Sequence, residues 1–147
     1  MSTVLSVYAL CVVVLFFKMF AISCYQGFYR ITRMTFKNAE DAKLVGRTPS
    51  AEELPQVARA KNAWLNDLEN IPLFFALGGL CVLLDTPADR TVWLFCIFTT
   101  ARVLHTLTYL AGWQPWRTIA YFVGIGCLMG LAGMIVFVLV GQGGFGG

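Results

Sequence analysis

The chain has 147 residues, the size of one ordinary domain, but its composition is not that of a water-soluble domain. Apolar residues make up 58% of it and charged residues only 13%, whereas soluble domains carry about 25% charged residues. The net charge of +3 is too small to indicate a nucleic-acid-binding protein. An aromatic content of 14% excludes a disordered chain. The composition therefore predicts an integral membrane protein.

Four apolar segments are each long enough to cross a bilayer as a helix. About 20 helical residues reach about 30 Å, which is the thickness of the hydrocarbon core. The first segment lacks the basic start and the small-residue cleavage site of a signal peptide, so we interpret it as a retained span. The predicted fold class is all-α, with a single four-helix transmembrane domain over residues 1–147. The expected spans are residues 4–29, 65–84, 91–112 and 118–141.

The connection between the first two spans, about residues 30–60, is the charged part of the chain. With four spans, this loop and the turn before the fourth span lie on the same side of the membrane. The positive-inside rule places that side in the cytoplasm, of either a bacterial inner membrane or the endoplasmic reticulum. Ser50 and Glu53 resemble a capping box that precedes Pro55, so the second helix should begin before the membrane. The basic residues of the loop and its borders are Arg30, Arg33, Lys37, Lys43, Arg47, Arg59 and Lys61.

The cysteines and the single histidine, His105, do not form a recognisable metal site. No two cysteines lie within four residues of each other, which excludes the usual zinc-binding pair. All of them fall within apolar segments, so we interpret them as buried, reduced thiols. They are Cys11, Cys24, Cys81, Cys96 and Cys127.

Polar residues recur on one face of each of the last three predicted helices. Spacings of three and four residues place side chains on one face of a helix. In the predicted topology, all of these faces lie in the cytoplasmic half of the bilayer, where charged groups are usually functional or paired. We therefore predict a polar pocket between the helices, open to the cytoplasm. Its residues are Arg30; Arg59, Asn62, Asn66 and Glu69; Arg102, His105, Thr106 and Tyr109; and Arg117, Thr118 and Tyr121.

The predicted pocket has an excess of positive charge, contributed by four arginines. This charge suits a cytosolic anion that also carries an ammonium group, such as a thiol-bearing peptide. We expect Glu69 and Arg102 to form an ion pair, because opposite charges on converging helix faces pair in hydrocarbon. Lys18, alone in the first span, is interpreted as a lysine that snorkels to the membrane surface.

Four segments of the chain resemble the superfamily of membrane-associated proteins in eicosanoid and glutathione metabolism, abbreviated MAPEG. They occur in the family's order and at matching spacing. The segment 65–69 and the loop motif favour the branch of microsomal glutathione transferases and prostaglandin E synthases. The resemblance implies a homotrimer that binds glutathione between neighbouring subunits and takes a lipophilic second substrate from the bilayer. The four segments are 36–42, 59–72, 101–109 and 115–124.

The resemblance also implies roles for individual residues. Arg117 matches the arginine that the family places at the thiol, and Thr118 occupies the position of a serine in the prostaglandin synthase. Asp41 matches a loop aspartate proposed to act in prostaglandin isomerisation. Asn62 stands where the family usually has arginine, and Lys61 or Arg59 is the candidate to supply that charge at the site. The positions that match glutathione contacts are Arg30, Asn66, Glu69, His105, Tyr109, Arg117 and Tyr121.

The resulting prediction is a glutathione transferase or peroxidase that directs the thiolate against lipophilic electrophiles or lipid hydroperoxides, a detoxifying activity. A prostaglandin-type isomerase that uses glutathione is one alternative. A non-catalytic lipid-binding membrane protein is another, because a fold alone does not specify a function. A small proton-coupled exporter fits less well, since its glutamate usually lies in the first helix and Glu69 lies in the second.

Overall fold

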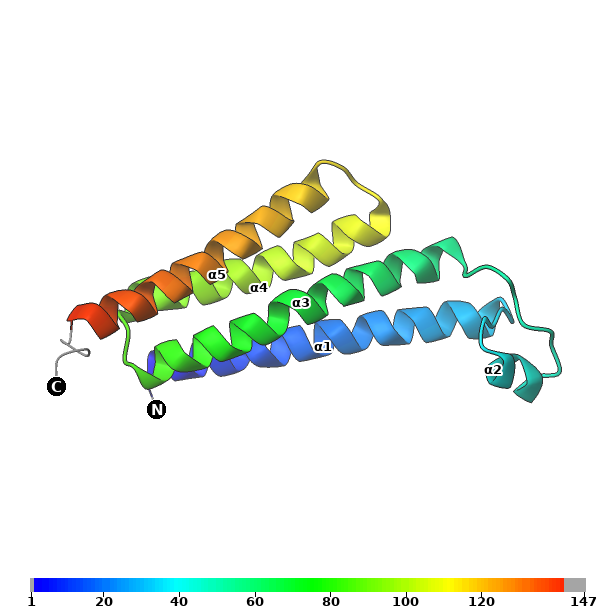
Figure 1. Cartoon of the computed structure of the whole chain (residues 1–147), viewed down its shortest axis with the longest axis horizontal. Helices are drawn as coiled ribbons and strands as arrows, with labels where there is room; N and C mark the ends of the chain where they lie inside the picture. Colours follow the sequence, from blue (N-terminus) through cyan, green and yellow to red (C-terminus); the bar gives the residue numbers. More distant parts are fainter. Residues whose placement is uncertain (1, 142–147) are drawn as a thin grey trace.

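The computed structural model describes residues 2–141 and is helical throughout, apart from the connecting segments. The long helices run up and down in chain order, and the start of the first and the end of the last lie at the same end of the molecule (Figure 1). The helices are α1 Thr3–Thr32, α2 Ala39–Leu44, α3 Pro55–Leu83, α4 Ala88–Ala111 and α5 Trp116–Gly141.

Three helices, α1, α4 and α5, are long and apolar enough to cross a membrane. Helix α3 has a comparable length of 29 residues, but Asp67 and Glu69 interrupt its apolar sequence. The predicted second span, 65–84, forms the second part of this helix. The all-helical architecture predicted from the sequence is therefore confirmed.

Helices α3 and α4 lie between the other two long helices. Each contacts α1 and α5, whereas α1 and α5 do not contact each other in the described residues. Helix α5 packs most extensively on α4, and this hairpin diverges from α1 and α3 toward the 112–115 turn (Figure 1). That divergence leaves the beginning of α5 accessible.

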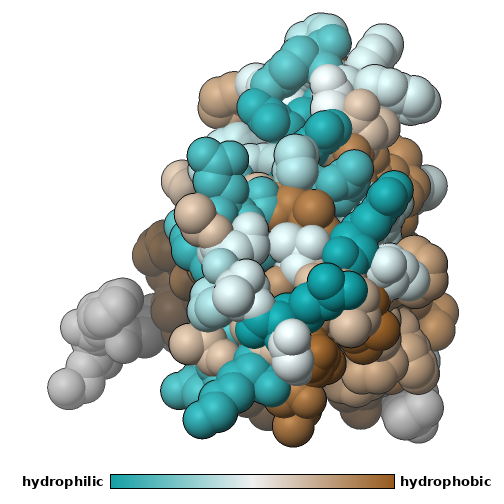
Figure 2. Space-filling model, turned by 90° about the vertical axis from the view of Figure 1, so that its right-hand side faces the viewer, coloured by the Kyte–Doolittle hydropathy of each residue, from teal (hydrophilic) through white to brown (hydrophobic). Residues whose placement is uncertain are grey.

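The connection expected over residues 30–60 is more ordered than the sequence indicated. Helix α1 continues to Thr32, the short helix α2 forms within the connection, and α3 already begins at Pro55. Seen from the α2 end, hydrophilic residues cover much of the surface (Figure 2). The charged end of the molecule is thus a folded cap on the bundle.

The capping box predicted for α3 is wrong. Pro55 is indeed the first helical residue, but the residue before it, Leu54, provides no side-chain cap. Ser50 lies five residues before the helix, too far to reach its free N–H groups, and its hydroxyl donates to the Glu52 carbonyl at 2.8 Å. Glu53 binds an arginine instead.

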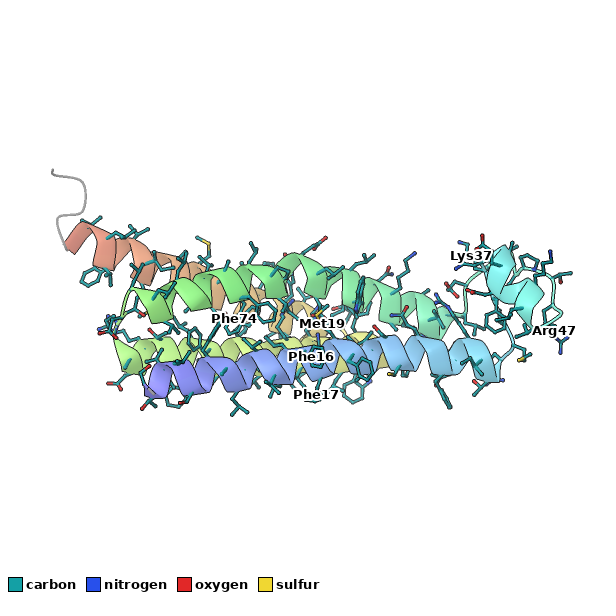
Figure 3. All side chains as sticks on the ribbon, turned by 90° about the horizontal axis from the view of Figure 1, so that it is seen from below. Phe16, Phe17, Met19, Lys37, Arg47 and Phe74 are labelled. Carbon is teal, nitrogen blue, oxygen red and sulfur yellow. The ribbon has the colours of Figure 1, made fainter. Side chains whose placement is uncertain are left out.

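An aromatic cluster forms the core between α1, α3 and α4. The rings of Phe74 and Phe98 are stacked at 4.5 Å, and Phe95 meets Phe74 edge-on at 5.5 Å. Tyr8 covers this cluster, and its hydroxyl donates to the carbonyl of Phe75 at 2.7 Å. Figure 3 shows the Phe74 side chain directed into the bundle. These contacts fix α1 against α3.

The outer surface is apolar as well, as expected for helices that face lipid. Phe16 and Phe17 of α1 are about 60% and 61% exposed, and Figure 3 shows them on the outer side of the bundle. Two of the thiols predicted to be buried, Cys24 and Cys96, are exposed. The reason is that a membrane helix turns much of its apolar surface to lipid, so an apolar neighbourhood in sequence does not imply burial.

The close approach of α1 to α3 requires a glycine. A Cβ at Gly78 would lie 2.7 Å from Cε2 of Tyr8 and 3.2 Å from Cε1 of Phe95. Gly78→Ala is therefore expected to destabilise the bundle by about 1–3 kcal/mol, measured as a lower thermal midpoint in detergent micelles. Gly133→Ala is the control, because nothing lies within 4 Å of its Cβ. Equal midpoints for the two variants would contradict the prediction.

Candidate functional site

The turn between α4 and α5 positions the beginning of α5. Gly112 ends α4 in the left-handed conformation, with φ of 72°, a position that glycine adopts without strain. Trp113 then donates its backbone N–H to the carbonyl of Thr108 at 2.9 Å, and α5 starts at Trp116. The turn expected before the fourth span is confirmed. It places Arg117 in the first turn of α5, beside the last turn of α4.

His105, Tyr109, Arg117 and Tyr121 meet where α4 faces α5. The His105 ring lies 5.6 Å from the ring of Tyr109 and 6.3 Å from that of Tyr121. The guanidinium carbon of Arg117 lies 4.5 Å from the centre of the Tyr109 ring, within cation–π distance. His105 is buried, and its Nδ1 has no hydrogen-bond partner in the part of the chain that the structure describes. Four of the residues predicted for one site are therefore neighbours.

Gln114 is part of this group, although it is not among the residues predicted from the sequence. A guanidinium has only donors, so the amide oxygen of Gln114 must face Arg117, and it accepts from Nε at 3.1 Å. The amide nitrogen then donates to the hydroxyl of Thr118 at 3.0 Å. Gln114 lies three residues before Arg117 and four residues before Thr118, and this spacing could have indicated the contact.

Arg102 joins the α4 side of this group to α3. It is fully buried, and its Nη1 donates to Oδ1 of Asn66 at 2.9 Å. Its guanidinium carbon lies 5.8 Å from the ring of Tyr121. A Cβ at Gly124 would be only 3.0 Å from Nη2, so the glycine makes room for the guanidinium. Arg102 thus holds Asn66 of α3 near Tyr121 of α5.

The predicted ion pair between Glu69 and Arg102 does not form. Glu69 lies on the exposed face of α3, whereas Asp67 is completely buried and pairs with Lys18 of α1. Residues two apart on a helix point about 200° apart, so only one of the two carboxylates can face the bundle. The interpretation of Lys18 as a snorkelling lysine is also wrong, because its side chain is 8% exposed and bound to Asp67.

Arg30 lies in a second polar group, near α2. Its Nη2 is 2.9 Å from Oε2 of Glu53, and its Nε donates to Oε1 at 3.4 Å. The two side chains line a hollow of about 750 Å³ with Lys61 and Trp64 of α3. Arg30 is therefore bound to a loop carboxylate rather than placed beside Arg117.

Three other predicted residues, Asn62, Arg59 and Asp41, are not among the residues that form either group. Asn62 is exposed on α3, and Arg59 reaches across to α4, where its Nη1 donates to the carbonyl of Leu110 at 3.5 Å. Asp41 is exposed on α2 and accepts from Nδ2 of Asn38 at 3.2 Å. Figure 1 shows α2 at the end of the molecule, away from α5. The single chain therefore does not bring all the predicted residues to one place.

An apolar groove of about 640 Å³ follows the outer side of α4 and α5. Trp113 and Trp116 line one end of it, and Trp93 lines the other. Ile97 and Leu104 of α4 lie between these ends. Trp116, at the first end, directly precedes Arg117 in the chain, so an apolar surface adjoins the polar group.

Known proteins resemble this chain over most of its length. The family model described as "MAPEG family" matches residues 8–137. Human (Homo sapiens) microsomal glutathione S-transferase 1 is 37% identical over 120 residues, which cover 78% of this chain and 77% of the relative. Rat (Rattus norvegicus) prostaglandin E synthase is 35% identical over 115 residues, 78% of this chain and 74% of the relative. The protein is thus an integral membrane protein that belongs to the MAPEG family.

Proposed function

We propose that this protein is a glutathione transferase that activates the glutathione thiol for attack on lipophilic electrophiles. The observation that carries the proposal is the arrangement of Arg117. Its guanidinium is stacked on Tyr109 and oriented by Gln114, whose amide also donates to the hydroxyl of the exposed Thr118. The similarity to microsomal glutathione S-transferase 1 supports glutathione as the anion that these donors bind.

The chemistry follows from the charge of Arg117. A free thiol has a pKa near 8.5, so only a few per cent of it is thiolate at neutral pH. A guanidinium close to the sulfur favours the thiolate, and the proton leaves to solvent. The thiolate sulfur then forms a bond to an electrophilic carbon, and the leaving group departs with the electron pair of the broken bond. Thr118 is assigned a hydrogen bond to the same sulfur.

A lipid hydroperoxide is the second substrate class that we propose for the same thiolate. The sulfur attacks the distal peroxide oxygen, the O–O bond breaks, and the lipid leaves as an alcohol after protonation. The sulfenic acid of glutathione then reacts with a second glutathione to give the disulfide and water. The apolar groove that begins at Trp113 and Trp116 supports the arrival of such substrates from the bilayer.

We infer that the working site is completed by a neighbouring copy in a homotrimer. Asn62 and Glu69 lie on an exposed face of α3, within or close to the membrane, where an uncovered charge is costly. A second copy on that face would cover them. It would also bring a second Arg30 toward the group around His105 and Tyr109, as the family resemblance implies.

The polar groups favour glutathione entry from the cytoplasm. Arg117 and the basic loop lie toward the same end of the molecule, and the positive-inside rule assigns that end to the cytoplasm. A membrane-impermeant glutathione analogue should protect Arg117 from a guanidinium-directed reagent only when it is added on the cytoplasmic side. Protection from the opposite side alone would contradict this topology.

A prostaglandin-type isomerase that uses the same thiolate is the second candidate. Identities of 33–35% to prostaglandin E synthases favour it, and Asp41 is the residue proposed to act in the isomerisation. Asp41 lies away from Arg117 within one chain, so this activity would depend on the neighbouring subunit. Asp41→Asn should then abolish isomerisation and leave conjugation of an aryl halide unchanged.

The proposed function is tested with the purified, detergent-solubilised protein. Turnover of a chromogenic aryl halide, a lipid hydroperoxide and a prostaglandin endoperoxide is measured with and without glutathione. Glutathione-dependent turnover of the first supports the transferase, and of the second the peroxidase. Turnover of the endoperoxide alone would favour the isomerase. If the protein binds glutathione but turns over none of the three substrates, the catalytic proposal is wrong.

A further inference from the structure

Three charged side chains are buried together in the membrane-embedded part of the bundle, each on a different helix. Lys18 of α1 is paired with Asp67 of α3, with side-chain exposures of 8% and 0%. Arg102 of α4 is 0% exposed, and its hydrogen-bond partner, Asn66, is neutral. We call these residues the buried charge cluster: Lys18, Asp67 and Arg102. It contains two cations and one anion.

The structure leaves the positive excess of this cluster uncompensated. Among residues 2–141, Nε and Nη2 of Arg102 have no hydrogen-bond partner, and neither does Oδ1 of Asp67. The nearby acid Glu69 is exposed on the other side of α3, and Glu53 is bound to Arg30. An excess cation in a region of low dielectric is unfavourable unless an anion binds nearby.

The buried charge cluster is connected through Tyr121 to the residues assigned to glutathione binding. The Arg102 guanidinium is 5.8 Å from the Tyr121 ring, which in turn lies 6.3 Å from His105. Arg102 and Tyr109 are seven residues apart on α4, or about 10 Å along the helix. At an effective dielectric constant of about 20, a unit charge at about 10 Å changes the affinity for an anion about tenfold.

We propose that the net positive charge of the buried charge cluster strengthens the binding of anionic glutathione. Lys18 supplies the second cation, which gives the cluster its net charge of +1. This inference rests on the proposed glutathione site. None of the three residues touches glutathione in this proposal, so they act through the electric field of the site. The competing role is structural, in which the Lys18–Asp67 ion pair serves only to hold α1 against α3.

A series of variants separates charge from pairing. Lys18→Met makes the cluster neutral, because Asp67 then balances Arg102. Combining Lys18→Met with Asp67→Asn removes the ion pair but restores one net positive charge. The electrostatic role therefore predicts weaker binding in the single variant and recovery in the double. The structural role predicts no recovery, since the pair is absent from both.

The measurement is the dissociation constant of glutathione for the assembled protein in micelles. Lys18→Met is expected to raise it about three- to tenfold, and the double variant to return it to within about twofold of wild type. Lys18→Arg, which keeps the charge, should bind as wild type does. Lys43→Met on α2 is the matched control, because its ammonium is solvent-exposed and screened. Its dissociation constant should not change.

Two results would overturn the inference. One is an unchanged dissociation constant in Lys18→Met, and the other is a double variant that binds as weakly as Lys18→Met. If the double variant does not assemble, equally weak binding in Lys18→Arg and Lys18→Met would also refute it. A wild-type protein that binds no glutathione would instead refute the proposed function, so the two failures are distinguishable.

Discussion

Arg117→Ala is expected to reduce conjugation at neutral pH about tenfold for each unit by which the thiol pKa of bound glutathione returns toward its free value. The variant removes the cation beside the sulfur, and the guanidinium–Tyr109 stack with it. Thiolate absorbance in the glutathione complex should fall in parallel. Raising the pH should recover part of the turnover, because a larger fraction of the bound thiol is then deprotonated without the guanidinium.

Three further variants make this prediction specific. Arg117→Lys should retain part of the activity, since a point charge remains while the planar fork is lost. Thr118→Ala should have a smaller effect, because one hydroxyl donor contributes about 1 kcal/mol. Gln114→Ala removes the acceptor that orients the guanidinium and the donor to the Thr118 hydroxyl but leaves the charge of Arg117 in place, so it should also act less than Arg117→Ala. A well-assembled Arg117→Ala protein with normal thiolate absorbance and turnover would leave Arg117 only a role as a membrane-surface anchor.

Much of the group around Arg117 could be predicted from the sequence, because its geometry is local. His105 and Tyr109 are four residues apart on α4, and helical periodicity alone places them on one face. Arg117 and Tyr121 have the same spacing on α5. The short turn after Gly112 makes the two helices an antiparallel pair, so these faces meet near the turn. The spacing of these residues and the short turn were therefore sufficient to predict that they are neighbours.

The acid of α3 that faces the bundle could not be predicted in the same way. Asp67 and Glu69 are both acids on one helix at similar depth, and the choice between them depends on how α3 is rotated against α1 and α4. That rotation is set by long-range packing, such as Phe74 on Phe98, which no local pattern encodes. Lys18 was misinterpreted for the same reason, since its partner lies 49 residues away.

The position of Arg30 was also beyond the sequence pattern. Its carboxylate partner, Glu53, lies in the connection between the first two spans. The sequence predicted a loop there, whereas the structure has the short helix α2 within it. Asn62 and Glu69 are exposed in the single chain, and in the proposed homotrimer a neighbouring copy would cover them. One chain cannot reveal a surface that a second copy would cover, and a sequence pattern marks such residues only as polar.

The second large effect is expected for Asp67→Asn, measured as the free energy of unfolding in mixed micelles without glutathione. This change leaves the buried ammonium of Lys18 beside the buried guanidinium of Arg102, with no anion between them. Removing one partner of a buried ion pair costs about 3–5 kcal/mol, because the other charge is stranded. Glu69→Gln is the matched control, since it removes the same negative charge from a residue that forms no ion pair within the described part of the chain.

The order of the related variants tests the cause. Lys18→Met should lower the free energy of unfolding less than Asp67→Asn does. In Lys18→Met the cation of Arg102 still neutralises the Asp67 carboxylate, whereas in Asp67→Asn the cluster keeps two cations and has no acid. Combining the two changes should recover most of the lost stability, since a buried pair replaced by neutral groups of similar size is often nearly neutral in free energy. If Glu69→Gln were instead the most destabilising of these variants, the acid that stabilises the bundle would be Glu69, and the rotation of α3 described here would be wrong.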